Sequence, residues 1–88
     1  MIGRWQFVVK LKNIERNGDF IWCDYYPENQ PESGFIRVDL SNEKIVERIA
    51  APYEKSNEST IYSHYAMLKL IDIQNIRPLP EITGAAWY

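Results

Sequence analysis

His64 is the only histidine of the chain and the side chain best suited to acid–base chemistry. An imidazole acts as a general base when a carboxylate orients it and a substrate can reach it, and Glu54 and Glu58 are the candidate carboxylates. This pairing would suit a small-molecule-binding or hydrolytic domain. A lone histidine beside the apolar stripe of a helix is more often a packed or surface residue, because catalysis needs partners that this spacing does not supply. We therefore predict no catalytic residue and keep His64 as an alternative candidate site.

Cys23, the only cysteine, follows Trp22 and precedes Asp24. A neighbouring carboxylate raises the pKa of a thiol, so the sequence favours a core residue over a nucleophile. One histidine and one cysteine give no paired ligand spacing for zinc. The four glycines are isolated and form no phosphate-binding loop. We expect no metal and no cofactor.

Aromatic and basic residues occur together in two segments that we expect to be strands, which could form a platform for stacking bases. The aromatic residues are Trp5, Trp22, Tyr25 and Tyr26, and the basic ones are Arg4, Lys10 and Lys12. The net charge is −2 and no basic block exists, so the electrostatic attraction that dominates nucleic-acid binding has no source. We predict no nucleic-acid partner. A large apolar patch more often marks a protein interface.

The composition predicts one globular domain covering residues 1–88. With 88 residues, of which 45% are hydrophobic, the chain can form a single core. A small secreted domain would usually carry several cysteines, so a reducing compartment, the cytoplasm, is expected. The uncharged run around Phe7 is only five residues long before Lys10 and Lys12 interrupt it, so we expect no membrane span.

The stretch 59–75 has the length and periodicity of a helix. Ser59 and Thr60 can cap its first turn, and the prolines at 78 and 80 require it to end near 72–75. Its main apolar stripe, predicted to cover a sheet, consists of Ile61, Tyr65 and Leu68. The opposite side is also apolar and consists of Ala66, Met67 and Leu70. That side should therefore contact the C-terminal tail or another molecule.

Residues before this helix read as strands. Alternating apolar residues predict strands at 4–12, 20–26 and 35–40. An Asn17-Gly18 hairpin turn joins the first two, and a one-residue bulge beside Gly18 would place Asp24 opposite Lys10 or Lys12. The segment 41–50 could be a helix or a strand. Its β-branched residues favour a strand, which we predict, followed by a polar connection at 53–57.

The final GAAWY segment should be a fifth, short strand or a packed tail, because Trp87 and Tyr88 are unlikely to be left in water. The expected fold class is α+β: an antiparallel meander of four to five strands with one C-terminal helix packed on one face, a two-layer sandwich.

One helix cannot bury every apolar residue of such a sheet, so we predict a non-enzymatic protein-interaction module or a homo-oligomer that binds a protein partner or itself, and no membrane. Its candidate interaction surface consists of Phe20, Trp22, Tyr26, Met67, Leu70 and Trp87.

Overall fold

The computed structural model describes residues 7–87, which form one five-stranded sheet and two helices. The elements are β1 (Phe7–Asn17), β2 (Phe20–Pro27), β3 (Gly34–Asp39), β4 (Lys44–Ile49), α1 (Pro52–Ser56), α2 (Ile61–Ile73) and β5 (Ile82–Trp87). The strand order is β4-β3-β2-β1-β5, and each neighbouring pair is antiparallel. The predicted strand at 41–50 is confirmed as β4, and the predicted fifth strand is confirmed as β5.

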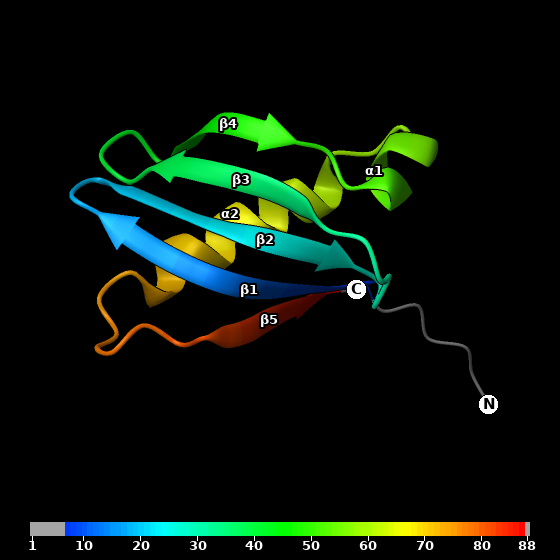
Figure 1. The fold of residues 1–88 in the computed structure, drawn as a ribbon. Helices are drawn as coiled ribbons and strands as arrows, with labels where there is room; N and C mark the ends of the chain where they lie inside the picture. The colour runs from blue at the N-terminus through cyan, green and yellow to red at the C-terminus, as the bar shows by residue number, and fades with distance from the viewer. Residues whose placement is uncertain (1–6, 88) are drawn as a thin grey trace.

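The molecule has two layers, as the expected α+β class requires. Helix α2 contacts all five strands from one side of the sheet, and Figure 1 shows it behind the strands. We call the side of the sheet under α2 the core face and the opposite side the outer sheet face. Within residues 7–87, no second helix covers the outer sheet face.

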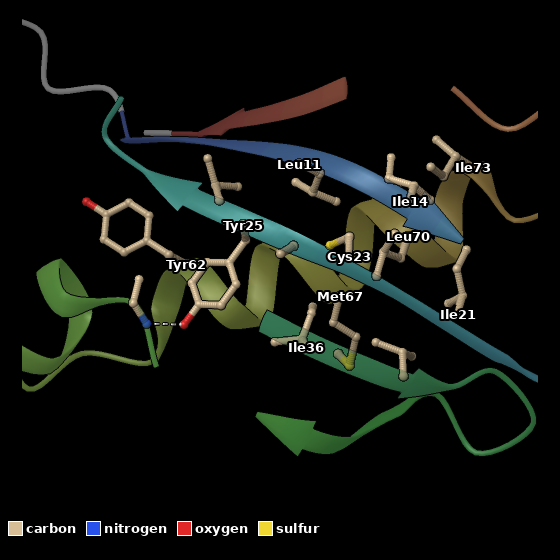
Figure 2. Close-up of a cluster of buried hydrophobic side chains, with 14 residues drawn as sticks. Leu11, Ile14, Ile21, Cys23, Tyr25, Ile36, Tyr62, Met67, Leu70 and Ile73 are labelled. Carbon is tan, nitrogen blue, oxygen red and sulfur yellow. Dashed lines mark hydrogen bonds between the residues drawn. The ribbon is translucent and has the colours of Figure 1, made fainter. Parts of the chain in front are cut away.

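The core lies between α2 and alternate residues of the strands. Period-two alternation is clearest in β2 and β3, where each second side chain is buried. Figure 2 shows this cluster, to which the strands contribute Val9, Leu11, Ile14, Ile21, Cys23, Tyr25, Ile36 and Val38, and α2 contributes Tyr62, Ala66, Met67, Leu70 and Ile73. The predicted core position of Cys23 is confirmed, and its neighbours Ile21 and Tyr25 in the alternation of β2 are buried with it.

Helix α2 packs on the sheet through the side opposite to the one we predicted. Ala66, Met67 and Leu70 are buried, whereas Ile61 and Leu68 are 37% and 42% exposed. Both sides of the helix are apolar, so periodicity alone could not choose between them. Which side of α2 faces the sheet is fixed at the two helix ends, where side chains distant in the sequence form hydrogen bonds with the helix backbone.

One such partner is Arg16 of β1, whose Nη1 donates to the Gln74 carbonyl oxygen at 2.8 Å, just beyond the last turn of α2. The other is Glu54 of α1, at the first turn. The prediction of a polar connection at 53–57 was wrong in part. Residues Pro52–Ser56 form the one-turn helix α1, with Pro52 at a position that favours helix initiation.

In the β1–β2 hairpin the predicted strand pairing agrees with the structure, but the turn and the bulge lie at other residues. Its two-residue loop is Gly18-Asp19, with Gly18 at φ 61°, not Asn17-Gly18. The predicted bulge lies within β1, where the register shifts between Lys12–Asp24 and Glu15–Trp22. Asn13 adopts φ 56° in this bulge. The prediction that Asp24 lies opposite Lys10 or Lys12 is confirmed, since it pairs with Lys12, but the predicted position of the bulge was wrong.

Candidate interaction surface

The most concentrated polar cluster of the structure surrounds Glu54, whose side chain is fully buried. Its Oε1 accepts hydrogen bonds from the Tyr25 hydroxyl at 2.6 Å, the Ser63 hydroxyl at 2.6 Å and Arg48 Nη2 at 3.0 Å. Its Oε2 accepts from the backbone amides of Tyr62 at 2.9 Å and Ser63 at 3.1 Å. These are free amides of the first turn of α2, so Glu54 caps this helix from another element.

The electrostatics of this cluster favour a carboxylate at Glu54 and a neutral phenol at Tyr25. Burial raises the pKa of Glu54, but the hydrogen bonds from Ser63, Tyr25 and Arg48 outweigh burial and leave the pKa below its usual value. Burial and the bond to Glu54 raise the pKa of Tyr25. Both carboxylate oxygens are occupied, and Tyr25, Glu54 and Ser63 line none of the hollows described below. The cluster therefore acts as a buried support for α2.

His64 lies on the exposed side of α2. Glu54 belongs to α1, and its buried carboxylate lies at the first turn of α2. The His64 ring packs edge-on against that of Tyr65, with centroids 5.6 Å apart. Among residues 7–85, no described hydrogen bond or ion pair joins His64 to a carboxylate. The arrangement gives the hydrolytic alternative no geometric support.

Cys23 is buried in the core face of β2, where burial and the charge of Asp24 raise the pKa of its thiol. Within the described residues, no group of three or more His, Cys, Asp or Glu side chains could hold a metal ion.

The outer sheet face carries alternate residues of β2 and β3, and at its centre a cation lies close to two aromatic rings. Arg37 pairs directly with Trp22, and its Cζ lies 5.4 Å from the Trp22 ring centroid and 6.0 Å from that of Phe35. The Arg37 Nη1 is also 2.7 Å from Glu47 Oε1 in β4. The two cation–π contacts and the ion pair together hold the guanidinium against the sheet.

One end of the outer sheet face is apolar. Phe20 is 42% exposed and Val46 is 46% exposed, and both border a shallow hollow of about 360 Å³. Asn17, Trp22 and Arg37 complete its lining. Exposed aromatic residues and arginine are the side chains most often found at the centre of protein interfaces.

The other end of the outer sheet face is basic. Lys12 Nζ lies 5.0 Å from the ring centroid of Tyr26, and Lys10 lies directly opposite Tyr26 on the neighbouring strand. These three residues border a second hollow, of about 290 Å³, together with Asn29, Gln30 and Pro31. Among the described residues no ion pair links either lysine to a carboxylate.

Of the predicted surface residues, Phe20, Trp22 and Tyr26 lie together on the outer sheet face. Met67 and Leu70 are in the core, so their assignment to an accessible surface was wrong. They are buried because the contacts at the two ends of α2 turn toward the sheet the side of the helix that we predicted to face away from it.

Trp87 is the last residue of β5, and its backbone pairs with Phe7 of β1. The Trp87 side chain lies outside the described part of the structure, as do Arg4 and Trp5. The prediction missed Phe35 and Arg37, although the alternation in FIRVD places both on the side away from Ile36 and Val38.

Comparison with family models, curated proteins and solved structures found no match to this chain. Among residues 7–87, no helix has the length and apolar character needed to cross a membrane.

Proposed function

We propose that the protein is a non-enzymatic binding module that docks a protein partner on its outer sheet face. The observation that carries this proposal is the arrangement of Trp22, Arg37 and Phe35, a cation in contact with two aromatic rings on the side of the sheet opposite to α2. The buried carboxylate of Glu54 is committed to supporting α2, so the strongest polar cluster offers no reactive group to a substrate.

The partner's chemistry follows from the two ends of this face. The hollow at Phe20 and Val46 fits an apolar side chain, because filling it removes exposed apolar surface from water. Lys10 and Lys12 at the other end fit carboxylates. The expected partner surface therefore combines an apolar anchor with acidic residues a short distance away. The net charge of −2 disfavours nucleic acid for the same face.

The apolar residues on the exposed side of α2 form a less suitable site. Ile61 and Leu68 are separated by the polar His64, and Asp72 follows one turn later. Isolated exposed apolar residues of this kind are ordinary on soluble proteins. The buried free thiol of Cys23 agrees with a reducing compartment, the cytoplasm, as the place of action.

Site-specific photo-crosslinking in cells tests the proposal. A benzophenone amino acid at Phe20, in the apolar hollow, should give protein adducts that mass spectrometry identifies. The same probe at Leu68, which is equally exposed at 42%, serves as the control and should give few adducts. Adding Lys10→Glu and Lys12→Glu should reduce the Phe20 adducts about tenfold or more, because two favourable charge contacts become repulsive.

Three outcomes contradict the proposal. Equal adduct yields at Phe20 and Leu68 show no preference for the outer sheet face. Adducts that contain only nucleic acid assign the face to a different class of partner. Unchanged adducts in the double glutamate variant exclude the expected acidic partner surface.

A further inference from the structure

The sheet has two edge strands, β4 and β5, and they differ in how they are protected. An edge strand presents unpaired backbone N–H and C=O groups that can pair with a strand of another chain. Proteins block such pairing with bulges, with charged residues and with charges that point toward the core. The presence or absence of these features shows which edge is available.

Strand β4 carries all three protective features. Lys44, Glu47 and Arg48 give three charges in six residues. Val46 is an extra residue in the ladder, because Arg37 pairs with Glu47 while the next residue of β3 pairs with Ile45. Arg48 lies on the core face and bonds to Ser63 and Glu54. A regular pairing along β4 is therefore blocked.

Strand β5 carries none of these features. Its sequence, ITGAAW, contains no charged residue, and it pairs with β1 through six consecutive residues without a bulge. Ile82 at its start is 60% exposed. A largely apolar hollow of about 380 Å³ lies over the paired strands β1 and β5, and it is bordered by Val8, Val9 and Lys10 of β1, by residues 82–85 of β5 and by Asn29.

We propose that β5 pairs antiparallel with β5 of a second copy, which joins the two sheets into one. We infer that the partner is a second copy of this chain from the number of unprotected edges. Each chain has one unprotected edge within its described residues, so two copies satisfy each other and the assembly closes as a two-fold dimer. Pairing of β5 with β4 of another copy would propagate into a filament, and the features of β4 prevent it.

The sequence of β5 also complements itself. In a two-fold pairing centred on Gly84, Ile82 of each copy lies opposite Ala86 of the other, and Thr83 lies opposite Ala85. Ile82 and Thr83 then each face an alanine, and no like charges oppose each other within residues 82–86. The two-fold axis is perpendicular to the sheet, so both outer sheet faces lie on the same side of the dimer and stay accessible.

Sedimentation of the full chain over a concentration series tests this dimer with a closely matched pair of variants. Ile82→Lys places a charge at the β5 edge and should raise the dissociation constant of the dimer about tenfold or more, because each copy loses an apolar contact. Ile49→Lys makes the same change at the β4 edge, where Ile49 is 61% exposed, and should leave the dissociation constant within about twofold.

Hydrogen exchange on the unmodified chain provides a readout that does not depend on a variant. Outward-facing amides within residues 82–87 should exchange more slowly at high protein concentration, whereas those of residues 44–49 should not change. A monomer at all concentrations overturns the proposal, as does equal weakening by the two variants. A dimer that resists Ile82→Lys but is lost with Phe20→Ser overturns it too and assigns self-association to the outer sheet face.

Discussion

A single carboxylate determines how α2 sits on the sheet. Glu54 receives hydrogen bonds from Tyr25 of β2, Arg48 of β4 and the first turn of α2, so three elements meet at one buried side chain. A buried charge with all its partners in place is tolerated, whereas removing one partner leaves the others unsatisfied. The position of the helix is therefore most sensitive to substitution at residue 54.

Glu54→Ala should lower the free energy of unfolding at pH 7 by about 3–5 kcal/mol, because Arg48 and the amides of Tyr62 and Ser63 lose their acceptor. Urea denaturation measures the change. The control Glu32→Ala removes an exposed carboxylate from a loop and should change the free energy by no more than about 0.5 kcal/mol. Equal effects of the two variants would contradict the role of Glu54 as a cap.

The same carboxylate predicts a pH dependence. The pKa of Glu54 is lower in the folded chain than in the unfolded chain, so its contribution is complete above the unfolded value of about 4.3. It is lost as the pH falls through the lower folded value, where Glu54 binds a proton. The difference between the original chain and Glu54→Ala should therefore shrink in acid, as urea denaturation at a series of pH values will measure. A difference that stays constant would exclude this linkage.

At the scale of elements, the strands could be predicted from the sequence because their alternation is local. FIWCDYY and FIRVD alternate around Cys23 and Ile36 without interruption, so each buried set follows from the period alone. The bulge could not be located in this way. It depends on Asn13 adopting a left-handed conformation, and the Asn17-Gly18 pair gave a stronger turn signal nearby.

The bulge makes a prediction about Asn13. Valine at this position should destabilise the fold by about 1–3 kcal/mol, because a β-branched residue is strained at φ 56°. Glycine tolerates this conformation, so Asn13→Gly should cost less than about 1 kcal/mol. Thermal unfolding followed by circular dichroism compares the two. Glu15→Val, on the regular part of β1 opposite Trp22, is the control and should be tolerated.

At the scale of the whole molecule, the layering could be predicted but the rotation of the helix could not. Order and periodicity together imply a sheet with one helix across it. Both sides of α2 are apolar, however, and the choice between Leu68 and Leu70 as the buried residue is made by Glu54 and Arg16. Strand alternation was enough to predict that Phe20, Trp22 and Tyr26 share one face of the sheet. That Met67 and Leu70 are buried in the core could not be predicted without knowing the rotation of α2.

The remote cap of α2 also bears on the order of events during folding. A helix of 13 residues is marginal in water, and α2 has no cap from the side chain of Thr60 at its own start. A synthetic fragment of residues 59–75 should therefore be mostly random coil by circular dichroism, and a strongly helical fragment would contradict this. On this basis we expect α2 to become a stable helix only after β2, β4 and α1 have assembled around Glu54, so the sheet forms before the helical layer that covers it.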